Sequence, residues 1–313
     1  MRALATLLVL LPVVAGAEEL PRVVVVRSSN LAAYNTVVAG FSAEVRAQVE
    51  ELTLPSSQQG IADAVETVQK RSPALVLAVG PQAATAARRM LRDVPVLFTM
   101  VPWYERYGLE GPDVTGIALT NALSVELSLL ATVAPGRRRI GILHDPRYSA
   151  ALVAEAAEEA QTRGVVVVPI EIDSASRLDR VLSGAKDRVD ALLLIADKTL
   201  GNAELVRRLI DFAREQKLPL MGHAGSQVKE GALMSLSPSY AGIGQQAGRL
   251  ANRIVHEKID PGALAVTAPE VLDLSLNLET ARRLGNTERL ALQILEYAAK
   301  HGYTVRVHES GAH

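Results

Sequence analysis

ALVLAVGPQAATAA, residues 74–87, is the stretch that decides the fold of this chain. It begins with an apolar run of strand length, and Gly80-Pro81 follows where such a strand would end and a helix begin. Proline suits the first position of a helix, where its missing N–H would have no partner in any case. The stretch therefore predicts a buried strand followed at once by a helix, the repeating unit of parallel α/β sheets.

The same unit recurs along the chain. Further strands are predicted at 23–26 (VVVV) and 94–99 (VPVLFT), and a second series begins at Arg138 with RRIGILH. An apolar stripe at helical spacing follows the first strand and predicts a helix packed on the sheet; it consists of Leu31, Tyr34, Val38, Phe41 and Val45. With 313 residues, the chain is long enough for two domains. We expect an α/β fold of two Rossmann-like lobes with parallel sheets and an interlobe cleft.

Composition and motifs exclude several function classes. Lys plus Arg number 33 and Asp plus Glu 34, so no global field favours nucleic acid as a partner. The absence of cysteine excludes disulfides, thiol nucleophiles and a lipid anchor on an N-terminal cysteine. No G-x-S-x-G, H-E-x-x-H or phosphate-loop motif occurs, and the histidines are scattered without ligand spacing. We therefore expect no enzyme, no cofactor and no metal.

The N-terminus has the pattern of an export signal. Met1-Arg2 precedes the apolar stretch 3–14, which is followed by the small residues Ala15-Gly16-Ala17. The stretch is shorter than the roughly 20 apolar residues of a spanning helix. We expect a signal peptide over residues 1–17 that is cleaved, and a periplasmic product without a lipid anchor.

Open α/β sheets bind ligands beyond the carboxyl ends of their strands, so the residues that follow each predicted strand are the candidate ligand contacts. Many of these residues are equally suited to capping the next helix, and both interpretations stay open for them. The candidates are Ser28, Ser29, Asn30, Gly80, Pro81, Gln82, Thr99, Met100, Thr120, Asn121, Asp145, Asp197, His223 and Ser237.

Aromatic residues cluster in WYERY, directly after the strand at 94–99. Trp103, Tyr104 and Tyr107 can stack on a flat ligand at the rim of a cleft. They can equally form a hydrophobic plug beneath the loop. Trp103 is included among the candidate ligand contacts.

Five runs, in this order, resemble ABC transporter substrate-binding proteins of the type that includes tryptophan and tyrosine importers. The likeness extends from about Val23 to Gly285 and is carried by ALVLAVGPQAATAA (74–87), VPVLFTMVPWYERYGLEGPDVTGIAL (94–119), RRIGILHDPRYSAAL (138–152), the run from Lys217 to Val255, and LDLSLNLETARRLG (272–285). The resemblance implies a type I periplasmic binding fold, no catalysis, and delivery of a small solute to a membrane permease. It also implies that the loop from Asp145 to Tyr148 lines the cleft.

Two positions depart from the family pattern. Where relatives commonly have an acidic residue before proline, this chain has Met100-Val101-Pro102, and Ser237-Pro238-Ser239-Tyr240 lacks the aspartate often found before the tyrosine. Two carboxylates that would meet an ammonium group are missing. The ligand can therefore be an amino acid, a carboxylate without an amine, a nucleobase-like ring or a peptide-like solute.

The predicted organisation has two lobes and an extension. Residues 18–121, joined by about 239–258, form the N-terminal lobe, and residues 122–238, joined by about 259–285, form the C-terminal lobe. Residues 286–313 extend beyond the usual end of the family, with a helix face at Leu290, Ile294, Tyr297 and Ala298 and a strand or tail after it.

The expected function is that of a monomeric, exported solute-binding protein. It captures an amino acid or a related carboxylate or aromatic compound in the cleft and delivers it to an ABC permease in the inner membrane. One alternative is a ligand-sensing protein that serves a membrane receptor or kinase. A second alternative is an exported enzyme that uses His144, Asp145, Asp197 or His223.

Overall fold

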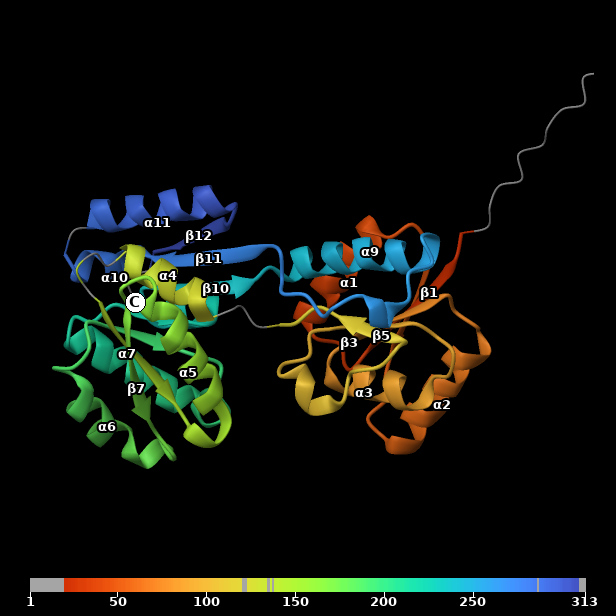
Figure 1. The fold of residues 1–313 in the computed structure, drawn as a ribbon, viewed down its shortest axis with the longest axis horizontal. Coiled ribbons are helices and arrows are strands. Elements are labelled where there is room, and N and C mark those ends of the chain that lie inside the picture. Colours follow the sequence, from red (N-terminus) through yellow and green to blue (C-terminus); the bar gives the residue numbers. More distant parts are fainter. Residues whose placement is uncertain (1–19, 120–122, 134–135, 137, 286, 310–313) are drawn as a thin grey trace, which may run out of the picture.

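The computed structural model describes residues 20–119, 123–133, 136, 138–285 and 287–309. The predicted signal peptide lies outside the described residues, as do the candidates Thr120 and Asn121. The chain forms two lobes side by side, each a sheet with helices on both faces (Figure 1). The predicted α/β fold of two Rossmann-like lobes is confirmed. In the described ranges, every helix is too short or too polar to cross a lipid bilayer.

The first sheet is parallel throughout, in the order β2-β1-β3-β4-β5. Helices cover both faces of this sheet, because successive valines of the VVVV run point to opposite faces and each face is apolar. Val23 and Val25 pack into one apolar cluster with α1 (Ala32–Glu44) and α9 (Tyr240–His256), while Val24 and Val26 pack into another with α2 (Gln58–Lys70) and α3 (Pro81–Met90). The strands are β1 (Arg22–Arg27), β2 (Gln48–Thr53), β3 (Leu75–Val79), β4 (Val96–Thr99) and β5 (Val114–Gly116).

One helix of the first lobe comes from far along the chain. Helix α9 follows a strand of the second lobe and lies along α1 (Figure 1). The two helices approach at glycines, since a Cβ on Gly244 would lie 2.1 Å from the carbonyl oxygen of Val37. The helices of this lobe are α1 (Ala32–Glu44), α2 (Gln58–Lys70), α3 (Pro81–Met90) and α9 (Tyr240–His256), with 3-10 turns η1 (Tyr104–Tyr107) and η4 (Pro261–Ala263).

The second sheet has the order β12-β11-β10-β9-β8-β6-β7. It departs from the expected parallel arrangement at one place, because β11 runs antiparallel to β10. The described C-terminal residues belong to this sheet: β12 pairs in parallel with β11. The strands are β6 (Arg139–His144), β7 (Val166–Glu171), β8 (Ala191–Leu194), β9 (Leu220–Gly222), β10 (Met234–Pro238), β11 (Leu272–Asn277) and β12 (Thr304–His308).

Helices also cover both faces of the second sheet. Ile140 and Ile142 pack toward α4, α5 and α11, whereas Leu143 packs toward α6 and α7. The predicted apolar face of the last helix packs on this core, with Ile294 and Ala298 fully buried. The helices are α4 (Leu123–Val133), α5 (Pro146–Gln161), α6 (Leu178–Ala185), α7 (Ala203–Glu215), α8 (Gly225–Glu230), α10 (Leu278–Arg283) and α11 (Thr287–His301), with 3-10 turns η2 (Ala175–Arg177) and η3 (Thr199–Gly201).

The segment after α9 differs from the predicted domain organisation, which assigned residues 259–285 to the C-terminal lobe. The backbone N–H of Gly262 donates to the carbonyl of Pro112 at 2.7 Å, and that of Ala118 donates to the carbonyl of Thr267 at 2.9 Å. Residues 261–267 thus lie along the edge of the first sheet beside β5. The chain rejoins the second lobe only at β11. The sequence could not place this segment, because η4 is a short turn without a periodic apolar pattern.

Candidate functional site

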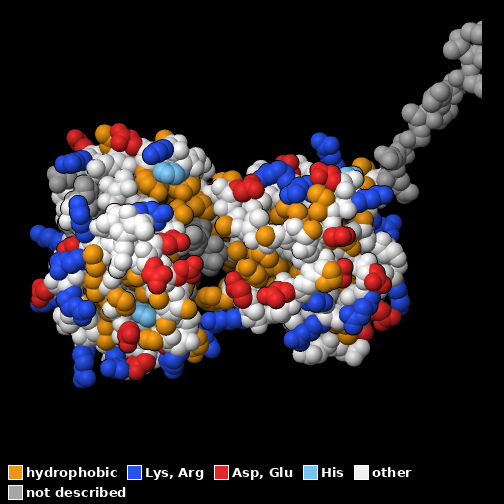
Figure 2. Space-filling view, viewed as in Figure 1, with side chains coloured by type: hydrophobic (Ala, Val, Ile, Leu, Met, Phe, Trp, Pro, Cys, Tyr) orange, Lys and Arg blue, Asp and Glu red, His pale blue; other side chains and the backbone are white. Residues whose placement is uncertain are grey.

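The two lobes contact one another through loops that follow their strands. Arg106, in η1 after β4 of the first lobe, donates from Nη2 to the backbone carbonyl of Tyr148, in α5 after β6 of the second lobe, at 3.4 Å. Figure 2 shows the surface hollowed between the two lobes. The carboxyl ends of β4 and β6 therefore face the same interlobe space, which is where the candidate ligand contacts were predicted.

Three groups of the first lobe converge after β1 and β3. The Oγ of Ser28 accepts a hydrogen bond from the backbone N–H of Ala83 at 2.9 Å, so Ser28 fastens the first turn of α3. Gly80 has φ of +93°, and a Cβ there would lie 2.5 Å from the Tyr34 hydroxyl and 2.6 Å from the Ser28 Oγ. Glycine is therefore required at position 80, because the positive φ is unfavourable for other residues and a side chain would clash with Tyr34 and Ser28.

The other candidates of this region differ in their exposure. The side chain of Asn30 accepts a hydrogen bond from Asn35, which in turn accepts one from Arg27. Ser29 is half-buried, Pro81 occupies the first position of α3, and Gln82 is exposed. Asn30 is therefore held in place by its hydrogen bond to Asn35, and the side chain of Gln82 is open to solvent.

The turn after β4 is strained and partly buried. Thr99 and Met100 are buried, and both Met100 and Trp103 adopt positive φ, at +59° and +49°. Positive φ is uncommon outside glycine and marks a backbone that its surroundings hold in place. The hydroxyl of Thr99 is buried without a hydrogen-bond partner in the described structure.

The aromatic cluster of this turn is divided between core and surface. Tyr104 packs on Phe98 with ring centroids 5.3 Å apart, and burial followed by the Glu105 carboxylate raises the pKa of Tyr104. Tyr107 is exposed, while Trp103 is half-buried beneath the Arg106 guanidinium. Tyr104 thus fills the space beneath the loop, as in the interpretation of a hydrophobic plug. Trp103 instead lies against Arg106, the residue that contacts the second lobe.

Asp145 and Asp197 form one buried network in the second lobe. The carboxylate of Asp145 accepts hydrogen bonds from Arg147 and from the Thr199 hydroxyl, the latter at 2.5 Å. The carboxylate of Asp197 accepts from the Ser149 hydroxyl and from the backbone N–H groups of Asp145 and Thr199. Hydrogen bonding by Arg147 is the largest cause that holds the pKa of Asp145 far below its usual range. Both aspartates therefore stabilise loops of the lobe through their hydrogen bonds, and Asp145 does so as an ionised group.

The two histidines at strand ends are also placed inside the lobe. His144 is buried with neither ring nitrogen hydrogen-bonded in the described structure, and burial lowers its pKa. His223 is half-buried beside Gln227, whose side-chain oxygen accepts from the backbone N–H of His223. Ser237 is half-buried in β10. Within the described residues, no group of three or more His, Asp or Glu side chains is arranged to hold a metal.

Tyr148 is the centre of a cation cluster. The ring centroid of Tyr148 lies 5.1 Å from Lys198 Nζ, 5.5 Å from the Arg147 guanidinium and 5.9 Å from that of Arg106. Arg106 comes from the first lobe and the other two cations from the second, so this ring joins charged groups of both lobes at the cleft.

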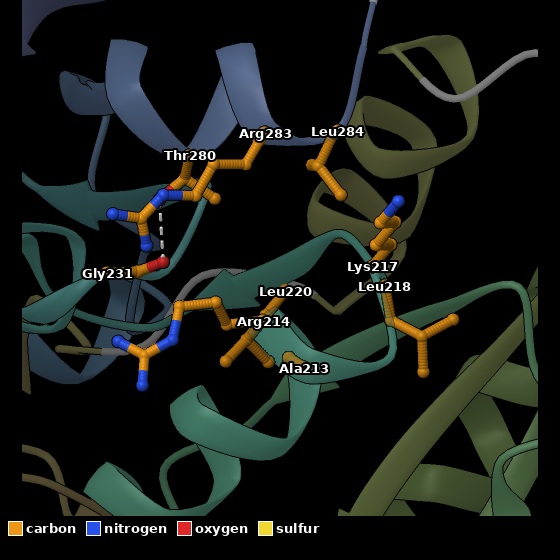
Figure 3. A pocket seen from close by; sticks show the side chains of 9 residues that line it. All are labelled: Ala213, Arg214, Lys217, Leu218, Leu220, Gly231, Thr280, Arg283 and Leu284. Carbon is orange, nitrogen blue, oxygen red and sulfur yellow. Dashed lines mark hydrogen bonds between the residues drawn. The ribbon is translucent and has the colours of Figure 1, made fainter.

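Pockets are also found away from the candidate contacts. Figure 3 shows one between α7, β9 and α10, where the Thr280 hydroxyl donates to the carbonyl of Gly231. It lies beside the amino end of β9, whereas the candidate contacts follow the carboxyl ends of the strands. A second lies between α4 and α5. None of the predicted ligand contacts lines either pocket; the first is lined by Ala213, Arg214, Lys217, Leu218, Leu220, Gly231, Thr280, Arg283 and Leu284.

Tyr34, Arg106 and Lys198 contact the candidate residues and are not among the predicted ligand contacts. Tyr34 was assigned to the core stripe of the first helix, although its hydroxyl reaches Gly80. Arg106 lies within the aromatic run WYERY, and Lys198 follows Asp197 directly. A search for basic residues next to the predicted aromatic and acidic candidates would have found both cations.

Comparison with known proteins agrees with this architecture. A tyrosine-binding protein of Clostridioides difficile is 23% identical over 231 residues, which cover 71% of this chain and 66% of that protein. The ligand-free, open structure of a substrate-binding protein with adhesive properties from Clostridium difficile has a TM-score of 0.72 at 20% identity, covering 85% of this chain and 95% of that one.

A second solved structure is an ABC domain in complex with L-Trp from Streptococcus pneumonia. Its TM-score is 0.58 at 18% identity, covering 91% of this chain and 100% of that chain. These likenesses show the type I periplasmic binding fold. The family model for ABC transporter substrate binding protein matches residues 24–301, nearly the whole described chain. The chain with this two-lobed fold therefore belongs to the ABC transporter substrate binding protein family.

Proposed function

We propose that this protein captures a small organic solute between its lobes and delivers it to an ABC permease. The observation that carries the proposal is the contact of Arg106 with Tyr148, because it places strand-end loops of both lobes around one space. A solute that contacts both lobes binds their closed arrangement more tightly than the open one, and binding therefore shifts the population toward the closed arrangement. The closed protein would then present one combined surface of both lobes to the permease.

The proposed ligand is an amino acid or a related carboxylate or aromatic compound. The tyrosine-binding relative and the complex with L-Trp support this class. In this chain, the half-buried rings of Trp103 and Tyr148 lie on the two sides of the interlobe contact and are linked through Arg106. Aromatic side chains in this position suit a planar ligand, since they offer large contact area and have few rotatable bonds.

Ligand-dependent unfolding tests the proposal. The purified protein is heated with a panel of amino acids, aromatic acids, nucleosides, sugars and short peptides. A compound at 100 times its Kd is expected to add about 2.7 kcal/mol to the free energy of unfolding and to raise the midpoint. If sugars alone raise the midpoint, the proposed ligand class is wrong. If no compound does, solute capture itself loses its support.

We also propose that the protein is exported and cleaved after Ala17. The charged start, apolar stretch and small residues of the N-terminus support this, as does membership of a transporter family. N-terminal sequencing of protein recovered from the periplasmic fraction is expected to begin at Glu18. An uncleaved chain in the membrane fraction would contradict the proposal.

Gly80→Ala is expected to weaken binding of the best ligand at least tenfold. The new Cβ would overlap the Tyr34 hydroxyl and the Ser28 Oγ and displace two groups at the cleft rim. The matched control is Gly302→Ala, which also has positive φ, at +70°, but meets nothing within 4 Å. Both variants carry the backbone cost of roughly 1–3 kcal/mol, whereas only Gly80→Ala is expected to change the Kd measured by calorimetry. Equal Kd values for the two variants would show that Gly80 does not contribute to ligand binding.

A further inference from the structure

The cation cluster around Tyr148 is not balanced by acidic side chains. Arg147 is paired with the buried Asp145 carboxylate. Arg106 and Lys198 form no ion pair within the described residues, although both lie within 6 Å of the same ring centroid. Each of these two cations lacks a carboxylate partner in the part of the chain that the structure describes, and a bound anion would supply one. The cluster thus presents unpaired positive charge to the cleft from both lobes.

The acidic groups near the cleft are, by contrast, already bonded within the protein. Asp145 and Asp197 accept hydrogen bonds from Arg147, Ser149 and Thr199 and from backbone N–H groups. Both are at most 4% exposed. An ammonium group that reached either carboxylate would have to break these bonds in a buried place, which is costly.

Two further acidic side chains of these lobes are paired with arginines. Glu51, in β2, pairs with Arg27, and Asp173, after β7, pairs with Arg177. Of the cations around the Tyr148 ring, Arg147 has a carboxylate partner, whereas Arg106 and Lys198 have no ion pair in the described structure. The electrostatics favour a ligand that brings a negative group without a positive one.

We propose that Arg106, Tyr148 and Lys198 bind the carboxylate of the ligand, and that this ligand is an aromatic carboxylate without an ammonium group. This inference rests on the proposed function and specifies its ligand class. The carboxylate accepts hydrogen bonds from the guanidinium and the ammonium group, while the aromatic ring packs on Trp103 or Tyr148. Because Arg106 belongs to the first lobe and Lys198 to the second, one carboxylate bonded to both draws the lobes together.

Matched ligand sets test the inference by calorimetry. Each set holds the aromatic ring constant: L-tyrosine, 3-(4-hydroxyphenyl)propionate and tyramine, then L-tryptophan, indole-3-propionate and tryptamine. The propionates keep the carboxylate and lack the amine, whereas tyramine and tryptamine keep only the amine. We expect a propionate to bind at least tenfold more tightly than its amino acid, and the amines not to bind.

The outcomes separate this inference from the proposed function. If an amino acid binds more tightly than its propionate, the amine-free class is wrong while solute capture stands. If none of these compounds binds and another solute does, the aromatic carboxylate is wrong. If no solute of the wider panel binds either, the proposed function fails as well.

Variants test the assignment of the residues. Arg106→Gln and Lys198→Gln are each expected to weaken propionate binding at least tenfold and to leave the unfolding midpoint nearly unchanged. The controls are Arg89→Gln on α3 and Lys186→Gln after α6, which remove exposed cations of the same two lobes away from Tyr148. Propionate affinity that stays at the wild-type value in Arg106→Gln and Lys198→Gln would overturn the assignment.

Discussion

Gly244→Ala is expected to destabilise the protein by about 3 kcal/mol or more, because it forces apart two backbones that cannot relax separately. The added Cβ would lie 2.1 Å from the carbonyl oxygen of Val37 and 2.8 Å from the backbone nitrogen of Phe41. No side-chain rotation relieves a clash with backbone, so α9 has to move away from α1. Urea denaturation followed by circular dichroism measures the loss.

Gly184→Ala is the matched control for this helix glycine. Gly184 lies within α6, and a Cβ there meets nothing within 4 Å. Alanine favours the helix over glycine, so the control is expected to gain about 0.5–1 kcal/mol. A Gly244→Ala protein as stable as the wild type would show that α1 and α9 do not pack as closely as described.

Asp145→Asn is expected to cost about 1.5–3 kcal/mol at neutral pH, the typical contribution of hydrogen bonds to a charged group. The carboxylate is fully buried, accepts from the backbone N–H of Arg147 at the start of α5, and also accepts from Thr199. The value stays below that of a fully buried ion pair because the Arg147 side chain is 61% exposed and is screened by solvent. Urea denaturation at neutral pH measures it.

The pH dependence gives this prediction a second readout. The pKa of Asp145 is lowered in the folded protein, so its contribution is present above the unfolded value of about 4 and is lost as the pH falls below it. The free energy of unfolding of Asp145→Asn is therefore expected to fall less steeply below pH 4 than that of the wild type. Asp211→Asn, which removes an exposed pair with Arg214, should change stability by less than about 1 kcal/mol. Parallel acid profiles of Asp145→Asn and wild type would contradict the assignment.

The repeated strand and helix units could be predicted because their residues are buried on both faces of a sheet. Apolar runs such as 74–79 and 94–99 carry that signal locally. Strand β2 was missed because it is an edge strand with exposed charges: Glu50 and Glu51 pair with arginines instead of packing in the core. The antiparallel direction of β11 depends on where the chain returns after η4, which no local pattern records.

The positions of the candidate residues at strand ends were easier to predict than the hydrogen bonds of their side chains. Asp145 and Asp197 follow buried strands, as predicted, and topology alone brings them to one edge of the sheet. Their partners Ser149, in α5, and Thr199, in η3, come from separate elements, so the sequence does not reveal that both carboxylates are already hydrogen-bonded. The cation cluster at Tyr148 forms between two lobes, so no local sequence pattern predicts it.

The packing of α9 on α1 also bears on the order in which the chain can fold. The side chain of Asn252 donates to the carbonyl of Glu44 across 208 residues of sequence, and Val37 and Phe41 are buried in the same cluster as Ile243 and Ala247. During synthesis, this face of α1 stays uncovered until α9 has left the ribosome. Contacts so distant in sequence form slowly, and surface left open meanwhile is prone to aggregation. The first lobe begins the chain but is among the last parts to complete its core.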